Sequence, residues 1–139
     1  MTPEQQHLIQ TSWAQLTPIA DQAAALFYAR LFELDPALKP LFTGDMKAQG
    51  AKLMQAINLV VRSLDKLDSL LPALQELGQR HVGYGVQAAH YDIVGTALLW
   101  TLEQGLGDTF TAPTRTAWGE AYSRLATVMQ SAGKAAVPA

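Results

Sequence analysis

Cysteine is absent from this 139-residue sequence. This absence excludes disulfide bonds, thiolate catalysis, zinc fingers and iron–sulfur clusters bound through thiolates. Charged residues are also scarce, at 16% against 49% hydrophobic residues, and the net charge is only −2. We therefore expect a large apolar core rather than disorder. Because no Lys/Arg cluster could contact phosphates, nucleic acid is not an expected partner.

Long hydrophobic runs are missing as well. No apolar stretch reaches the ~20 residues that span a bilayer. The N-terminal stretch MTPEQQHLIQ lacks the basic region and apolar run of a signal peptide. We therefore expect a single domain over residues 1–139, cytoplasmic and without a membrane partner, with a disordered tail from about residue 133.

Strand signals are nearly absent, whereas helix signals recur along the chain. Thr2, Thr17 and Asp35 each precede a proline, as an N-cap residue precedes the first helical position. Pro40 limits the third of these helices to about a turn. Apolar spacing and end signals predict further helices over 46–64, from about 70 to 81, over 88–104 and from 113. About seven short helices without heptads indicate an all-α fold of crossing helices.

Two of the three histidines, His81 and His90, lie nine positions apart. His81 continues a stripe formed by Leu70, Leu74 and Leu77, so it is either a core histidine bonded to a backbone carbonyl or a ligand. A metal site built only from protein ligands would need spacings such as H-x-x-x-H, which are absent. One imidazole on an apolar wall suits haem iron, which brings its other ligands. His90 is interpreted as a residue at a helix end, and His7 as a surface or packing residue.

Other catalytic motifs are missing. The sequence has no Ser-His-Asp order and no G-x-S-x-G elbow for acyl transfer. The GYG and GLG stretches lack a preceding strand, so they are interpreted as loop glycines and not as phosphate-binding motifs.

Four ordered stretches of the sequence resemble a known family: LFYARLFELDPALKPLF, KLMQ, LGQRHVGYGVQAAHYDIVG and AWGEAY. Together they extend from the second helix to the last. The sequence resembles the globins, in particular single-domain bacterial globins related to the haem domain of flavohaemoglobins, of the Vitreoscilla type. The resemblance implies a globin fold around a pocket for haem b (iron protoporphyrin IX).

The resemblance also implies roles for individual residues. His81 matches the proximal ligand of the haem iron, and Phe42 matches a phenylalanine that packs on the haem. Tyr28 and Gln49 match the residues that stabilise the gas ligand on the distal side. The other residues expected to contact the haem are Leu53, Val86, Tyr91, Val94 and Leu98.

The distal residues predict slower dissociation of bound oxygen. A hydrogen bond from Tyr28 or Gln49 to a partly negative ligand would be worth ~1.5–3 kcal/mol, which slows ligand loss roughly ten- to hundred-fold. No histidine is expected on that side. A sixth protein ligand could come only from Tyr28, Gln49 or Lys52, so the iron is expected to be pentacoordinate or weakly hexacoordinate.

One position departs from the family pattern. In flavohaemoglobin-like globins the proximal histidine is bonded toward a tyrosine and a glutamate of the last helix. Tyr91 matches the tyrosine, but the glutamate position falls near Gly133 and no acid is available there. Because such partners tune the basicity of the histidine, weaker electron donation from the histidine through the iron to bound oxygen is expected.

Three functions remain open from the sequence. The leading hypothesis is reversible binding of dioxygen, carbon monoxide or nitric oxide, as an oxygen carrier or store. The alternative is nitric-oxide dioxygenation or peroxidase-like detoxification, with a separate reductase because the chain stops where reductase domains would begin. A third hypothesis is a haem-free globin-like domain that senses or binds a partner, in which His81 is a core residue.

Overall fold

The computed structural model describes residues 2–42, 44–83 and 88–136, which form helices and contain no strand. The predicted all-α fold is therefore confirmed. The α-helices are α1 (Pro3–Leu16), α2 (Ala20–Leu34), α3 (Met46–Arg62), α4 (Leu71–Gly83), α5 (Ala88–Leu106) and α6 (Ala112–Ala136). The 3-10 helices are η1 (Thr17–Ile19), η2 (Pro36–Leu41), η3 (Leu64–Leu70) and η4 (Gly107–Thr109). The short helix expected after Asp35 is η2.

The helix starts follow local hydrogen-bonding chemistry. Thr2 is the expected N-cap and forms a capping box, since its hydroxyl accepts the Gln5 amide at 3.1 Å and the Gln5 side chain accepts the Thr2 amide at 3.1 Å. Asp35 and Asp45 cap η2 and α3 by accepting backbone amides two residues on. Thr111 caps the last helix by accepting the amide of Thr114 at 3.3 Å.

The predicted cap at Thr17 is wrong. Thr17 has a helical backbone, and its hydroxyl donates to the carbonyl of Ala14 at 3.0 Å. A residue that continues the preceding helix turns its hydroxyl back toward an earlier carbonyl and cannot accept from the next turn. The chain therefore passes through η1 before α2 begins at Ala20.

Two apolar clusters form the interior. The first joins α1, α3, α5 and α6 around Trp13 and Trp118, whose ring centroids lie 6.0 Å apart. The second joins α2, η2 and α5 around Phe27, Tyr28 and Leu31. Leu98 of α5 packs against both clusters. α5 therefore connects the structural core to the region where the candidate site residues lie.

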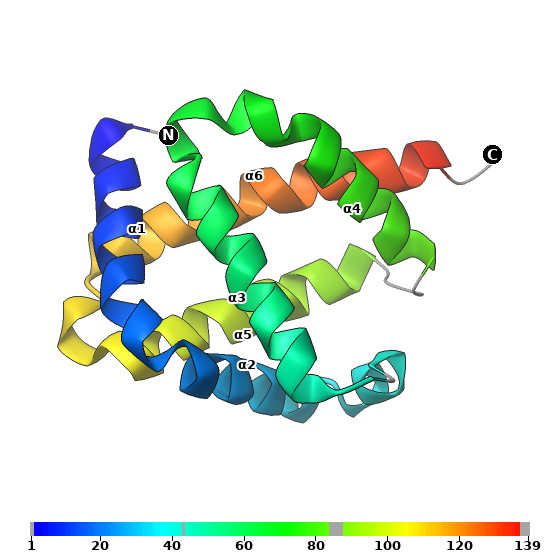
Figure 1. Cartoon of the computed structure of the whole chain (residues 1–139), viewed down its shortest axis with the longest axis horizontal. Helices are drawn as coiled ribbons and strands as arrows, with labels where there is room; N and C mark the ends of the chain where they lie inside the picture. Colours follow the sequence, from blue (N-terminus) through cyan, green and yellow to red (C-terminus); the bar gives the residue numbers. More distant parts are fainter. Residues whose placement is uncertain (1, 43, 84–87, 137–139) are drawn as a thin grey trace.

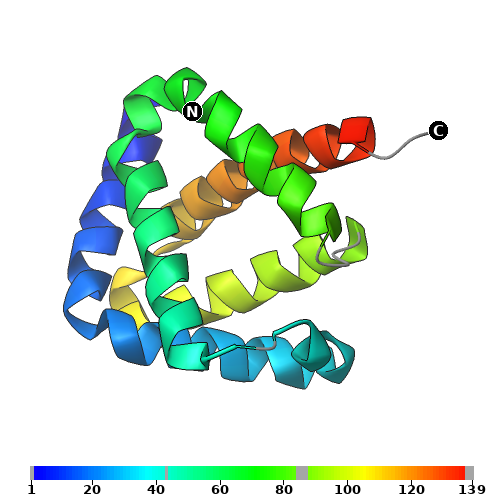
Figure 2. The ribbon, with the colours of Figure 1, turned by 45° about the vertical axis from the view of Figure 1, so that its right-hand side comes forward.

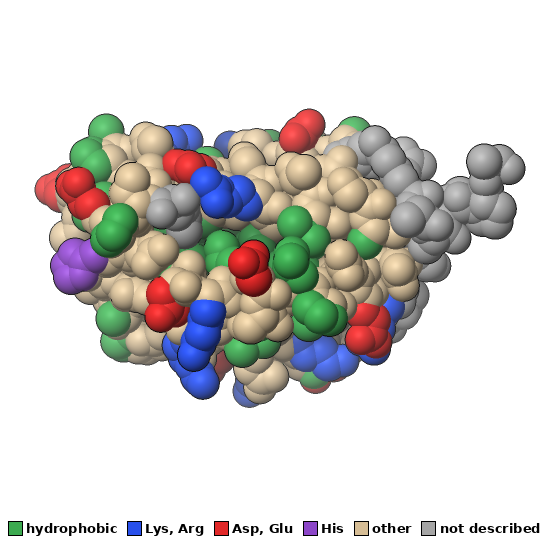
Figure 3. Space-filling view, turned by 90° about the horizontal axis from the view of Figure 1, so that it is seen from above, with side chains coloured by type: hydrophobic (Ala, Val, Ile, Leu, Met, Phe, Trp, Pro, Cys, Tyr) green, Lys and Arg blue, Asp and Glu red, His purple; other side chains and the backbone are tan. Residues whose placement is uncertain are grey.

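The helices cross one another instead of running side by side (Figure 1). In Figure 2, the ribbons of α3, α4 and α5 outline three sides of a triangle, with η3 at the corner between α3 and α4. Within the described part of the chain, no helix is long and apolar enough to cross a bilayer. Seen from above, lysine and arginine side chains are dispersed among acidic ones, and apolar groups gather in the middle of the face (Figure 3).

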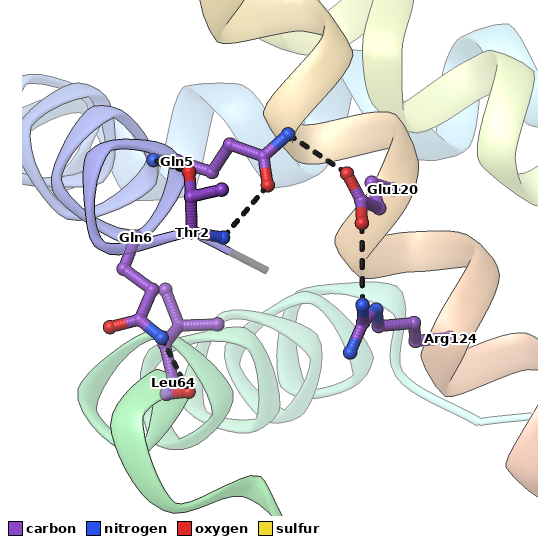
Figure 4. Close-up of polar contacts among 6 residues, drawn as sticks. All are labelled: Thr2, Gln5, Gln6, Leu64, Glu120 and Arg124. Atoms are coloured by element: carbon purple, nitrogen blue, oxygen red, sulfur yellow. Dashed lines mark hydrogen bonds and ion pairs between the residues drawn. The ribbon is translucent and has the colours of Figure 1, made fainter.

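Polar contacts join the start of α1 to α6 and to Leu64 (Figure 4). The Gln5 amide donates to Glu120 of α6 at 2.8 Å, and Glu120 accepts from Arg124 at 3.4 Å. Gln6 donates to the Leu64 carbonyl at 3.3 Å. The first helix is thus held against both α6 and the start of η3. The helical backbone of α6 extends to Ala136, and disorder of the tail from about residue 133 stays a prediction.

Candidate functional site

Tyr28 lies at the centre of an aromatic group on α2. Its side chain is buried, with 7% exposure. The ring centroids of Phe27 and Phe42 lie 5.0 and 5.4 Å away in edge-on arrangements, and that of Phe32 lies 6.2 Å away. Edge-on contacts of this kind stabilise aromatic clusters beyond their buried area. The Tyr28 ring is therefore placed in apolar surroundings by two rings of its own helix and one from the end of η2.

A close crossing of α2 and α3 brings Gln49 to Tyr28. A Cβ at Gly50 would lie 2.9 Å from the Cβ of Ala24, closer than side chains normally pack. Gly50 follows Gln49 in α3, and Ala24 is one turn before Tyr28 in α2. Burial raises the pKa of Tyr28, and a side-chain hydrogen bond with Gln49 partly opposes this rise. The predicted distal pair therefore lies together in the fold.

The expected apolar contact residues pack against the cluster that contains Tyr28. Phe42, Leu53, Val94 and Leu98 are all partly buried hydrophobic residues packed against the second cluster. They come from the end of η2, from α3 and from α5. Val86, the remaining expected apolar contact, lies outside the described residues. Partly exposed apolar side chains beside a fully packed cluster are the surface that an apolar cofactor could cover.

His81 lies in the last part of α4 and is half-buried. Its Nδ1 is 2.7 Å from the carbonyl oxygen of Leu77, so Nδ1 donates to that oxygen. This bond fixes the tautomer, and a metal could then be bound only through Nε2. A backbone-bonded imidazole is common to both interpretations of His81, the core residue and the iron ligand.

Tyr91 of α5 faces His81. Their ring centroids are 6.3 Å apart and their planes differ by 29°. The Tyr122 hydroxyl of α6 donates to the backbone carbonyl of Tyr91 at 2.6 Å. Burial raises the pKa of Tyr91, and burial together with the nearby Tyr91 and Asp92 raises that of Tyr122. The two tyrosines therefore stay neutral at physiological pH.

The donor set fits a haem better than a bare metal ion. No cluster of three or more His, Cys, Asp or Glu side chains suited to a metal ion occurs among the residues that the structure describes. His81 supplies one nitrogen. Tyr91, whose ring lies near His81, is on the same helix, α5, as the apolar contacts Val94 and Leu98. A single imidazole, an apolar wall and a buried phenol together suit a planar cofactor that brings four ligands of its own.

Sequence reasoning missed several residues that shape this region. Phe27 and Phe32 flank Tyr28, and the four-residue spacing of Tyr28 and Phe32 along α2 could have indicated the second contact. Tyr122 was visible within the AWGEAY stretch, but its partner on α5 was not. The glycines at 50 and 78 gave no signal, because a close helix approach depends on how two helices cross in three dimensions.

Comparison with known proteins identifies the fold family. The model of the globin family matches residues 25–129, which include Tyr28, Gln49, His81, Tyr91 and Tyr122. The chain belongs to the globin family. The predicted globin fold is thereby confirmed, and membership implies that the protein binds haem and diatomic gases.

Relatives of two kinds resemble this globin. Neuroglobin-1 of Oncorhynchus mykiss is 32% identical over 93% of this chain and 90% of its own length. A flavohemoprotein of Vibrio cholerae is 32% identical over 92% of this chain, but this globin spans only 33% of that protein. The likeness therefore extends to only part of a longer protein.

Two solved structures have the same fold. One is an engineered carbene transferase, a variant of a putative nitric oxide dioxygenase from Rhodothermus marinus, with a TM-score of 0.87, 28% identity and coverage of 97% of this chain and 94% of that one. The other is a globin from Campylobacter jejuni, with a TM-score of 0.84, 27% identity and coverage of 96% and 97%.

Proposed function

We propose that this globin holds haem b through Nε2 of His81 and reversibly binds dioxygen, as an oxygen carrier or store in the cytoplasm. The observation that supports this most directly is the pair of hydrogen-bonding side chains at Tyr28. The phenol of Tyr28 lies in an apolar aromatic group and meets an amide from a different helix. Such an arrangement is suited to a small polar ligand with partial negative charge.

The cofactor, when bound, supplies a ferrous iron that binds diatomic gases. The chain supplies the surroundings. The bond from His81 Nδ1 to the Leu77 carbonyl orients the imidazole. Phe42, Leu53 and Leu98 would give the ligand side of a bound haem an apolar lining and limit the access of water to it. The hydroxyl of Tyr28 stays protonated because burial raises its pKa, so it remains a donor.

The alternative is nitric-oxide dioxygenation or peroxide chemistry with a separate reductase. The likeness to flavohemoproteins and to the structure from Rhodothermus marinus supports it. Gly133 at the position of the family's glutamate weighs against it, because that carboxylate strengthens the proximal histidine. We favour reversible binding for this reason, and we place the gas ligand on the Tyr28 side in both cases.

The visible spectrum of the reduced protein tests the proposal, before and after addition of carbon monoxide and then oxygen. A strong Soret band that shifts with each gas is expected. The His81→Ala variant should lose that band or bind hemin much more weakly. A protein without a Soret band after reconstitution with hemin would contradict the proposal and favour the haem-free hypothesis.

A second measurement separates carrier from enzyme. Nitric oxide consumption is followed in the presence of oxygen, NADH and a flavin reductase. A single stoichiometric reaction with the oxygenated protein is expected. Sustained turnover, with continuous NADH use that depends on the globin, would instead support the dioxygenase alternative.

A further inference from the structure

We propose that one face of α6 sets the orientation of the His81 imidazole, through two close helix approaches that require Gly78 and Gly95. This inference rests on the proposed role of His81 as iron ligand. It assigns positioning roles to Gly78, Gly95 and Tyr122, none of which belongs to the Tyr28 side. Two independent contacts of α6 support it, one with α4 and one with α5.

The first contact is between the backbones of α4 and α6. A Cβ at Gly78 would overlap the main chain of Met129, with the Met129 Cα at 2.7 Å and its carbonyl carbon at 2.8 Å. Main-chain atoms cannot rotate away as a flexible side chain does, so only a displacement of α4 relative to α6 could make room. Gly78 directly follows Leu77, whose carbonyl accepts from His81. A displacement at Gly78 therefore moves both partners of the bond that orients the imidazole.

The second contact is between the Tyr122 ring and the backbone of α5. A Cβ at Gly95 would lie 2.8 Å from Cε2 and 3.1 Å from Cδ2 of Tyr122. With no side chain at Gly95, the ring lies against α5 and its hydroxyl reaches the Tyr91 carbonyl at 2.6 Å. Tyr91 in turn presents its ring to His81 at 6.3 Å. Tyr122 therefore fixes the part of α5 that faces the histidine.

The two contacts come from the same side of α6. Tyr122 and Met129 are seven residues apart, which is close to two helical turns, so they lie on one face roughly 10 Å apart. An α-helix is stiff over this length. Its face therefore sets the spacing between α4, which contains His81, and α5, which contains Tyr91.

The close helix approaches at Gly78 and Gly95 have a particular role in this chain. Gly133 leaves no carboxylate at the position where the family's glutamate would bond toward the histidine. The orientation of the imidazole then depends on the Leu77 carbonyl and on how α4 and α5 are held. Two glycines, each unfavourable in the middle of a helix relative to alanine, are explained by the close approaches that they permit.

Resonance Raman spectroscopy of the reduced, gas-free protein tests the inference, because the iron–histidine stretching band reports the orientation and strength of that bond. The variants are Gly78→Ala and Tyr122→Phe, and the matched control is Gly119→Ala on α6, where a Cβ would meet no atom within 4 Å. We expect the band to shift in both variants and to stay in place in the control. Hemin transfer to an excess of apomyoglobin should be roughly ten- to hundred-fold faster for Gly78→Ala.

The outcomes separate the inference from the proposed function. A wild-type protein with haem but without an iron–histidine band would contradict the role of His81 itself. A normal wild-type band that is unchanged in Tyr122→Phe and in Gly78→Ala would overturn only the inference. Should Gly78→Ala fail to fold, Tyr122→Phe decides alone, since it keeps the ring against Gly95 and removes only the hydroxyl. A lowered melting temperature with an unchanged band would show a purely structural role and overturn the inference.

Discussion

Close helix approaches at a glycine occur both on the side of the candidate site with Tyr28 and Gln49 (the Tyr28 side) and on the side with His81 and Tyr91 (the His81 side). The atoms in contact differ between the two sides. On the Tyr28 side, Gly50 lets α3 approach α2 until its backbone meets the methyl group of Ala24. On the His81 side, Gly78 lets α4 approach α6 until backbone meets backbone. An added Cβ at Gly50 would meet a single methyl carbon, whereas at Gly78 it would overlap several main-chain atoms of Met129 at shorter distances. The His81 side should therefore tolerate an added methyl group less well.

The two sides differ in how they use hydrogen bonds. On the His81 side, the donors His81 and Tyr122 are both bonded to backbone carbonyls, at Leu77 and Tyr91. On the Tyr28 side, the hydroxyl of Tyr28 and the amide of Gln49 interact with each other through their side chains. Backbone carbonyls are rigid acceptors and favour fixed orientation. Paired side chains can exchange a partner, which would suit the side proposed for the gas ligand.

The largest effect, on the free energy of unfolding, is expected from shortening Leu31, which lies in the same apolar cluster as Tyr28. Leu31 is 1% exposed in the second cluster. Leu31→Ala should lower the free energy of unfolding by about 2–5 kcal/mol, through lost burial and a cavity. Denaturant unfolding followed by circular dichroism measures this change. Leu59→Ala, at a position 47% exposed on α3, is the matched control and should lower the free energy of unfolding much less.

The next effect concerns the ligand. Tyr28→Phe keeps the ring but removes the hydroxyl, so it should cost about 1.5–3 kcal/mol of ligand stabilisation, or roughly ten- to hundred-fold faster oxygen dissociation. Stopped-flow mixing of the oxygenated protein with dithionite and carbon monoxide measures the rate. Dissociation of carbon monoxide, a less polar ligand, should change less. An unchanged oxygen rate would assign the hydrogen bond to Gln49 alone.

The comparison also shows what could be predicted from the sequence. Local signals were sufficient for most helix starts, since the capping box at Thr2 and the caps at Asp35 and Thr111 depend only on nearby residues. The predicted cap at Thr17 was wrong because the helical backbone continues through this residue. The resemblance of the sequence to globins predicted that Tyr28 and Gln49 form a distal pair, and the fold brings these two together.

What the sequence could not show depends on how helices cross. The bond from Tyr122 to Tyr91 joins residues 31 positions apart, and the approach of Gly78 to Met129 involves main-chain atoms. No periodicity encodes either contact. On the His81 side, the sequence therefore named the candidate ligand and Tyr91 but not the supports from α6, whereas both polar residues of the Tyr28 side were predicted.

A smaller effect is expected from Gln49→Leu, which removes the partner of Tyr28 and leaves the hydroxyl in place. Loss of one neutral hydrogen bond is worth about 0.5–1.5 kcal/mol, so oxygen dissociation should be roughly two- to ten-fold faster. The pKa of Tyr28 should rise further, because the Gln49 bond lowers it in the parent protein. Ultraviolet titration of tyrosine, compared with Tyr28→Phe, measures this. An equal effect of Gln49→Leu and Tyr28→Phe on the rate would mean that the two side chains act only as a unit.

The smallest effect is expected from pH. Burial raises the pKa of Tyr28 above its ordinary value of 10.0, and that of Tyr122 rises in the same direction. A raised pKa means that the folded protein favours the neutral phenol. The resulting stabilisation is complete below the unfolded value of 10.0 and is lost as the pH rises through the folded value. Oxygen dissociation should therefore be constant from about pH 6 to about pH 9, and unfolding should become easier only above about pH 10. A rate that rises within the neutral range would mean that a group other than Tyr28 controls the ligand, and repeating the series with Tyr28→Phe would show whether the dependence persists without the phenol.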